Sequence, residues 1–237
     1  MMKKSLDDPR FQSITDNYAE IRENIEKAAA RAGRSASGVR FMAVTKTVEP
    51  IYINHALSLG IDLIGENKVQ ELLSKLPYLE GSPEKHLIGH LQSNKVRKIL
   101  PEVSMIQSAD SLSLLNEISR RAVQLGMTAD VLLELNVAGE ASKTGLPAGL
   151  AEETAAAAAE LPGVRLRGLM AVPPLEATER ETRGYFAEMY RRFSDMQSRY
   201  PAVDTLSLGM SGDYAAAIEE GSTLIRVGSA LFGMRRY

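Results

Sequence analysis

The sequence predicts an α/β fold, a single (β/α)8 TIM barrel with an additional N-terminal helix. Eight short apolar segments alternate along the chain with segments whose apolar residues recur every three or four positions. Such alternation is typical of parallel strands joined by right-handed helical crossovers. No segment is left over for a second domain, and no G-x-G-x-x-G sequence follows the first strand. Both observations favour a closed barrel over an open doubly wound sheet.

The first predicted element is an amphipathic helix over Phe11–Arg34. Its apolar positions recur at spacings of three and four, and Gly33 with the Ser-Ala-Ser-Gly sequence after it ends the helix. The first strand, Val39–Thr45, runs directly into Lys46. Only residues 231–237 remain beyond the last strand and its turn, too few for an eighth helix. We therefore expect the N-terminal helix to cover that gap in the ring of helices.

The other elements follow in the same rhythm, each strand being a short apolar segment that ends in polar or glycine residues. The remaining strands are predicted at Ile61–Ile64, His86–Ile88, Met105–Gln107, Val131–Asn136, Val164–Met170, Thr205–Leu208 and Leu224–Val227. The remaining helices are predicted at Pro50–Leu59, Val69–Leu76, Asn94–Leu100, Leu112–Leu125, Leu150–Glu160, Thr182–Arg199 and Tyr214–Glu219. Because ligand groups of (β/α)8 barrels gather at the C-terminal ends of the strands, the residues that follow each strand are the candidates for function.

Composition argues against several classes of function. Lys and Arg (28) nearly balance Asp and Glu (30), which leaves a net charge of −2 and no basic field to attract nucleic acid. The absence of cysteine excludes disulfides, thiolate metal sites and cysteine nucleophiles. The sequence has neither a secretory signal nor an apolar run of ~20 residues. We therefore expect a cytoplasmic, monomeric protein that forms one domain over residues 1–237, with no metal and no membrane contact.

Two loops that contain glycine and serine predict a phosphate site. Gly228 and Ser229 follow the eighth strand, and Ser211 follows the seventh strand in the sequence Gly-Met-Ser-Gly. The loops after these two strands form the usual phosphate site of (β/α)8 barrels, where backbone N–H groups point at the anion. A tight turn explains either glycine pair alone. Both pairs together, in the two loops that the fold uses, favour phosphate.

Lys46 and Arg226 are the charged candidates beside these loops. Lys46 follows the first strand at the same rim, and an unprotonated lysine forms a Schiff base with a carbonyl compound. Arg226 lies in the apolar last strand two residues before Gly228, so the two face the same side. A buried arginine needs a partner, either a carboxylate such as Glu66 or Glu134 or a bound ligand ring. Pyridoxal 5′-phosphate (PLP) would use both the amine and the anion site.

Seven sequence blocks are spread over nearly the whole chain. They are AVTK (43–46), GEN with VQE (65–71), HLIGHLQSNK (86–95), SKTG (142–145), RGLM (167–170), LGMS (208–211) and IRVGSALFG (225–233). In this order they resemble the YggS/PROSC family of pyridoxal phosphate homeostasis proteins. Members of that family are described as vitamin B6 homeostasis proteins without an established catalytic reaction.

The resemblance implies a barrel similar to the N-terminal domain of alanine racemase and a role in intracellular PLP homeostasis. Lys46 would carry PLP as a Schiff base. Ser211, Gly228 and Ser229 would bind the phosphate group, and Arg226 would lie beneath the pyridine nitrogen. The resemblance implies no catalytic residue.

Three other residues of these blocks have open roles. Asn67 either contacts the cofactor or caps the helix that follows it. His90 lies near the rim without a metal-site partner at the required spacing. Lys143 either binds a second anion or lies in a solvated loop. Gly212 stands where the family often has an acidic residue, which affects the shape of the loop after Ser211.

Three functions are compatible with these residues. The first is a PLP carrier that supplies or buffers the cofactor for apo-enzymes, the second a weak PLP-dependent amino-acid racemase, and the third a barrel that binds another phosphorylated metabolite. Arg226 offers no hydrogen-bond acceptor, so it would leave the pyridine nitrogen unprotonated and the ring a weaker electron sink. This excludes little for racemisation, because alanine racemase uses the same device. Alanine racemase also uses a separate C-terminal domain to build the acid/base site on the opposite ring face, and this chain ends at Tyr237. We therefore expect the carrier, with the racemase as the alternative.

Overall fold

The computed structural model describes residues 8–140 and 144–234, which form nine strands surrounded by nine α-helices. The strands are β1 (Arg40–Val44), β2 (Leu63–Glu66), β3 (Glu84–Leu87), β4 (Met105–Ala109), β5 (Ala129–Asn136), β6 (Leu146–Pro147), β7 (Val164–Ala171), β8 (Thr205–Ser207) and β9 (Leu224–Val227). The helices are α1 (Pro9–Arg31), α2 (Pro50–Ser58), α3 (Val69–Lys75), α4 (Val96–Ile99), α5 (Leu112–Gln124), α6 (Ala151–Ala159), α7 (Glu179–Arg199), α8 (Tyr214–Glu219) and α9 (Ser229–Phe232).

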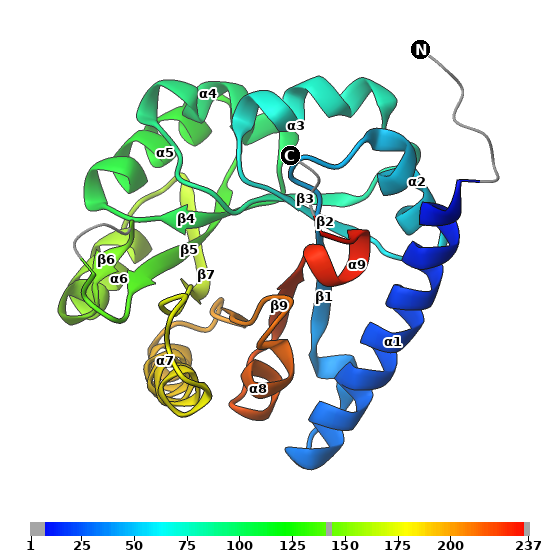
Figure 1. The fold of residues 1–237 in the computed structure, drawn as a ribbon. Coiled ribbons are helices and arrows are strands. Elements are labelled where there is room, and N and C mark those ends of the chain that lie inside the picture. Colours follow the sequence, from blue (N-terminus) through cyan, green and yellow to red (C-terminus); the bar gives the residue numbers. More distant parts are fainter. Residues whose placement is uncertain (1–7, 141–143, 235–237) are drawn as a thin grey trace.

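Eight of these strands close into a parallel barrel, as the sequence predicts (Figure 1). Their order is β4-β3-β2-β1-β9-β8-β7-β5, and pairing of β4 with β5 closes the ring. β6 is an addition that was not predicted: its two residues pair with Leu135 and Asn136 at the end of β5, beyond the part of β5 that β4 covers. All pairings are parallel, so the C-terminal ends of the strands meet on one face of the molecule. We call it the C-terminal face.

Helices differ from their predicted limits where local chemistry was not recognised. α7 begins at Glu179 rather than Thr182, because Thr178 and Glu181 form a capping box. In it, the side chain of each residue accepts a hydrogen bond from the backbone N–H of the other. The helix predicted at 94–100 is reduced to the single turn α4 between two 3-10 turns, and Pro101 lies in the second of these. Residues 229–232, where no helix was expected, form the single turn α9.

Apolar side chains lie both outside and inside the barrel wall. Two large clusters pack between the sheet and the helices. Two small ones consist of inward-facing residues: Met42, Leu63 and Leu224 in one, Met105, Leu132 and Met170 in the other. On β9, Ile225 and Val227 belong to an outer cluster, so Arg226 between them faces the barrel interior.

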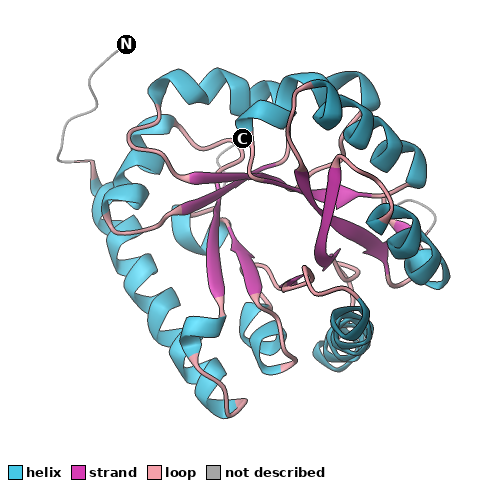
Figure 2. Ribbon diagram, turned by 180° about the vertical axis from the view of Figure 1, so that it is seen from behind, coloured by secondary structure: helices cyan, strands magenta, loops and turns pink. Residues whose placement is uncertain are grey.

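The N-terminal helix covers the gap beside the last strand, as predicted. Asp8 caps α1 by accepting from the Arg10 N–H, and Ile14, Ile21 and Ile25 are buried along one face. α1 contacts α2, α8 and α9, and its Asn17 donates to the Leu231 carbonyl of α9 (3.0 Å). Figure 2, drawn from behind, shows this long helix lying along the side of the barrel. Among the described residues, no helix has the length and apolar character needed to cross a membrane.

Candidate cofactor-binding site

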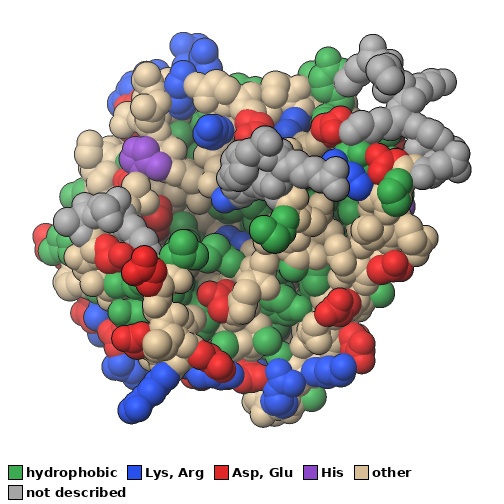
Figure 3. Space-filling view, viewed as in Figure 1, with side chains coloured by type: hydrophobic (Ala, Val, Ile, Leu, Met, Phe, Trp, Pro, Cys, Tyr) green, Lys and Arg blue, Asp and Glu red, His purple; other side chains and the backbone are tan. Residues whose placement is uncertain are grey.

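A cavity of about 960 Å³ opens on the C-terminal face next to β1 and β9. Lys46, Gly228 and Ser229 line it together with Val44, Thr47 and Arg10. The face drawn in Figure 3, over which α9 lies in Figure 1, is hollowed near its centre. Three of the six predicted cofactor residues therefore share one cavity. Ser211, Arg226 and Asn67 do not line it.

Lys46 reaches this cavity because of its position at the end of β1. It follows the inward-facing residues Met42 and Val44 by the two-residue period of a strand and is half-buried. Thr47, the next residue, has a φ of 64°, and no other described residue except glycine has a positive φ. A β-branched residue in this region is strained and persists only where its surroundings hold it.

This turn is held by four buried or half-buried residues, which we call the Lys75 cluster: Thr45, Glu66, Glu71 and Lys75. Lys75 Nζ donates to the Thr45 carbonyl (2.8 Å), to Glu66 Oε1 (2.6 Å) and to Glu71 Oε1 (2.6 Å). Glu71 Oε1 accepts from the Thr47 backbone N–H (2.5 Å). The cluster therefore grips the backbone on both sides of Lys46.

Burial and hydrogen bonding have opposite effects on the pKa values of the two carboxyl groups in the Lys75 cluster. Glu66 is only 1% exposed, and this burial raises the pKa of Glu66 although Lys75 and Thr45 both donate to the carboxylate. Burial also opposes ionisation of Glu71, but the bonds from Lys75 and the Thr47 N–H outweigh it and lower the pKa of Glu71. Sequence reasoning missed Lys75. Its spacing of four from Glu71 on one helix was the available signal.

The predicted phosphate loops lie together at the ends of β8 and β9. Ser211 Oγ accepts from the backbone N–H groups of Gly228 (3.2 Å) and Ala230 (3.1 Å). A side chain at Gly209, whose φ is 89°, would meet Ala217 Cβ at 2.6 Å, so this turn requires glycine. Two backbone N–H groups and a serine hydroxyl group therefore lie together at the ends of β8 and β9, and groups of these kinds can bind phosphate. The residues present fit a phosphorylated ligand.

Arg226 is 4% exposed inside the barrel and is hydrogen-bonded to neutral groups. Its Nη1 donates to the carbonyl (2.7 Å) and hydroxyl (2.6 Å) of Ser207, and its Nη2 donates to the Ala171 carbonyl (2.9 Å). Neither predicted carboxylate partner forms an ion pair with Arg226. Glu66 pairs with Lys75, and Glu134 interacts with Arg226 only by longer-range electrostatic attraction. Burial lowers the pKa of Arg226 to about 10, so it stays cationic at neutral pH.

Asn67 follows β2, the strand that pairs with β1, but it does not line the cavity. It is half-buried after β2, and the N-cap of α3 is Lys68, so the alternative that Asn67 caps this helix is wrong. A Cβ atom at Gly89 would clash with the Asn67 carbonyl, which shows how closely the loops after β2 and β3 approach each other. No other contact of Asn67 separates a cofactor role from a structural one.

Glu134 is a buried carboxyl group that sequence reasoning considered only as a partner for Arg226. Its Oε1 accepts from Thr144 Oγ1 (2.8 Å), whereas its Oε2 has no hydrogen-bond partner among the described residues. Burial raises the pKa of Glu134, and the nearby charge of Asp110 adds to the effect. Asp110 also pairs with His90 Nδ1 (2.8 Å) at the rim. Lys143 lies outside the described residues.

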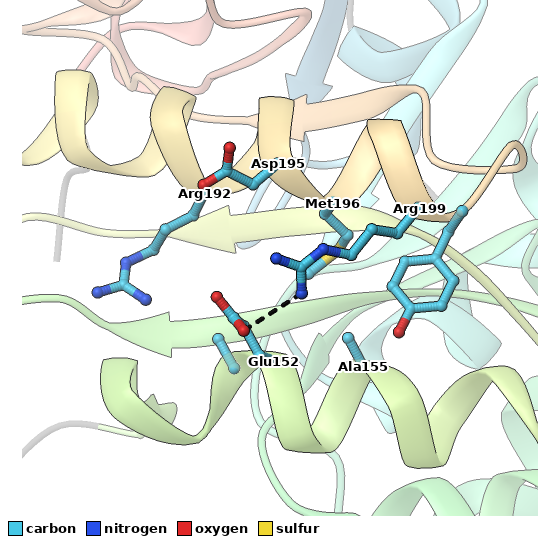
Figure 4. A pocket seen from close by; sticks show the side chains of 8 residues that line it. Glu152, Ala155, Arg192, Asp195, Met196 and Arg199 are labelled. Atoms are coloured by element: carbon cyan, nitrogen blue, oxygen red, sulfur yellow. Dashed lines mark hydrogen bonds and ion pairs between the residues drawn. The ribbon is translucent and has the colours of Figure 1, made fainter.

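Other candidate sites are weaker. A pocket of about 20 Å³ lies between α6 and α7, where Arg199 pairs with Glu152 (3.2 Å) (Figure 4). It contains no strand-end residue, and it is far too small for a cofactor. Within residues 8–140 and 144–234, no group of three or more His, Asp or Glu side chains is arranged to hold a metal ion.

Comparison with known proteins gives a consistent family match. A profile of the family described as "Alanine racemase, N-terminal domain" matches residues 17–236. A curated relative from Escherichia coli K12, named "Pyridoxal phosphate homeostasis protein", is 39% identical over 231 residues, which cover 96% of this chain and 99% of that protein.

Solved structures give the same result. An unknown protein from Bifidobacterium adolescentis has a TM-score of 0.92 and 37% identity, covering 97% of this chain and 98% of that one. PipY from Synechococcus elongatus, solved with PLP bound, has a TM-score of 0.78 and 33% identity, covering 89% of this chain and all of that one (100%).

The Lys75 cluster predicts a large cost for removing its cation. Lys75→Met keeps most of the apolar side chain but leaves Glu66 buried without its ion-pair partner, so the free energy of unfolding should fall by roughly 3–5 kcal/mol. Urea unfolding measures the loss. Adding Glu66→Gln should recover part of it, whereas the exposed Lys98→Met should change stability by no more than about 0.5 kcal/mol. An equal, small effect of both lysine substitutions would contradict a structural role for the cluster.

The raised pKa of Glu134 predicts a pH-dependent difference in stability. Above the usual glutamate value of 4.5, the folded protein retains a proton that the unfolded chain has released. Wild-type stability should therefore decline relative to Glu134→Gln as pH rises through this range. Urea unfolding from about pH 4 to about pH 7 measures the difference, with the exposed Glu160→Gln as control. A difference that does not vary with pH would show that the carboxyl group titrates normally.

Proposed function

The chain belongs to the alanine racemase N-terminal domain family and binds PLP in PLP homeostasis, and from this premise we propose that it holds the cofactor as a Schiff base on Lys46. We further propose that it is a carrier, which supplies PLP to apo-enzymes or buffers its concentration. The relatives named for PLP homeostasis and the PLP-bound structure of PipY support this assignment.

The observation that carries the proposal is the shared cavity of Lys46, Gly228 and Ser229. PLP needs an amine for its aldehyde and N–H donors for its phosphate, and both stand around one space. Ser211 would act beside Gly228, since its hydroxyl already lies within hydrogen-bond distance of that N–H. We propose Lys46, Asn67, Ser211, Arg226, Gly228 and Ser229 as the cofactor-binding residues.

The electrostatics of Arg226 are compatible with a carrier, although alanine racemase uses an arginine in the same way. PLP acts in catalysis as an electron sink, most strongly when an acid group keeps its pyridine nitrogen protonated. Arg226 is cationic, has only donors and is hydrogen-bonded to neutral acceptors. Beneath the ring it would donate to the nitrogen and leave it unprotonated. A bound cofactor would then be retained without strong activation.

One observation favours the alternative, a weak amino-acid racemase. Glu134 is a buried carboxyl group with a raised pKa, and its charge interacts with that of Arg226. A buried carboxyl group with a raised pKa can act as an acid or a base. We assign it no catalytic role, but it is the residue on which that alternative depends.

We also propose the setting in which the protein works. The cysteine-free composition agrees with a reducing, cytoplasmic compartment. Direct partners would be PLP-dependent apo-enzymes that accept the cofactor. We propose that residues 1–237 act as one domain and as a monomer, because the cofactor residues all come from one barrel.

Attachment of PLP to Lys46 can be tested by borohydride reduction. Peptide mapping of the reduced holoprotein should find a pyridoxyl group on Lys46. Lys46→Ala should lose the label yet unfold cooperatively, because a lysine at the rim contributes little to the core. Label on Lys95 or Lys143, with none on Lys46, would overturn the assignment.

Carrier and racemase are separated by two assays on one preparation of the holoprotein. A carrier should transfer PLP to an apo-enzyme and exchange little of the α-proton of L- or D-alanine with deuterated water. Exchange at a turnover on the order of 1 per second or above would establish the racemase instead. In that case Glu134→Gln should abolish exchange while leaving transfer intact, whereas the exposed Glu160→Gln should change neither.

A further inference from the structure

A line of polar side chains crosses the barrel interior and ends on Arg226. Ser207 Oγ accepts from Arg226 Nη1 (2.6 Å) and donates to Gln107 Oε1 (2.7 Å). Gln107 Nε2 lies 2.8 Å from His86 Nδ1, and His86 Nε2 lies 3.7 Å from Glu84 Oε2. The last distance is too long for a hydrogen bond and represents an electrostatic contact. We call Glu84, His86, Gln107 and Ser207 the interior relay.

The interior relay runs from the N-terminal end of β3 to the buried Arg226. Glu84 is about half exposed at the start of β3, where Arg40 donates to it (3.0 Å). His86 is 2% exposed, and Gln107 and Ser207 are fully buried. Burying a polar side chain costs free energy unless the side chain is hydrogen-bonded. Apolar residues such as Met42 fill the rest of the barrel interior without this cost.

The direction of every hydrogen bond in the relay follows from Arg226. A guanidinium group only donates, so Ser207 Oγ accepts from it, and the Ser207 hydroxyl donates its own proton to Gln107 Oε1. The amide nitrogen of Gln107 then faces His86 Nδ1, which must accept. The proton of a neutral His86 therefore lies on Nε2, toward Glu84. Burial lowers the pKa of His86, in agreement with a neutral ring.

We propose that the interior relay positions Arg226 for the pyridine nitrogen of the cofactor. The Ser207 hydroxyl helps to fix the plane of the guanidinium group at Nη1, and Gln107 accepts its proton, so that an Oγ lone pair faces Nη1. His86 in turn fixes the orientation of the Gln107 amide. These are positioning residues, since none of them lines the cofactor cavity. The inference rests on the proposed role of Arg226 beneath the ring.

Binding of two ligands tests this role: PLP, and 1-deazapyridoxal 5′-phosphate, which has a C–H group in place of the pyridine nitrogen. Wild type should bind PLP more tightly than the analogue. Gln107→Met, which keeps the volume but removes the hydrogen bonds, should weaken PLP by about tenfold and the analogue by less than about twofold. Ser207→Ala should act in the same way and serves if Gln107→Met does not fold.

The matched control is Met105→Leu, a volume-conserving substitution on the same strand as Gln107 and outside the relay. It should leave the preference for PLP unchanged. An unchanged preference in folded Gln107→Met or Ser207→Ala would overturn the positioning role, because loss of packing alone weakens both ligands equally.

A second measurement needs no cofactor. Nitrogen NMR of the unloaded protein should show His86 neutral with its proton on Nε2, and Gln107→Met should remove this tautomer preference. A proton on Nδ1 in wild type would overturn the relay itself. The expected tautomer together with equal binding of the two ligands by wild type would instead refute the cofactor role of Arg226, and the positioning role with it.

Discussion

The parallel pairing of β1 with β9 is the constraint on which the candidate site depends. It joins the first and last strands of the chain and sets Met42 opposite Arg226. Because both strands alternate, Val44 and Gly228 meet inside the barrel, where a Cβ atom at Gly228 would lie 3.3 Å from that of Val44. Lys46 follows Val44 by one more period and reaches the cavity beside Gly228. An amine and a set of N–H donors from opposite ends of the chain thus become neighbours when the barrel closes.

The protein buries two cations near this site by different means. Lys75 is surrounded by the carboxylates of Glu66 and Glu71, which cancel its charge locally and leave it a structural role. Arg226 is hydrogen-bonded to carbonyl and hydroxyl groups, which solvate its charge without cancelling it. Its charge still interacts with those of Asp213 and Glu134. One buried cation therefore maintains the backbone, while the other keeps a field that a ligand can use.

The sequence was sufficient to predict what depends on periodicity and order along the chain. Two-residue alternation predicted that Arg226 faces the side of Gly228, and the positions of Ser211 and Gly228 after the seventh and eighth predicted strands predicted that their loops meet. The relay was not predictable in this way, because Gln107 and Ser207 meet across a barrel whose register no local pattern specifies. Lys75 was missed for a similar reason: Glu71 lies on the same helix, but Glu66 and Thr45 lie on other elements, and only tertiary packing shows that Lys75 is buried.

Side chains fill the interior of the barrel in the part of the chain that the structure describes. Met42, Leu63 and Leu224 pack inside it, and the hydrogen-bonded side chains of Gln107 and Ser207 span it, so the barrel is plugged rather than tubular. If PLP is held on Lys46 as proposed, it would enter and leave through the cavity beside α9 and the start of α1. An apo-enzyme that takes the cofactor directly would then have to dock over this cavity, and its docked state would block the loading of a second PLP molecule.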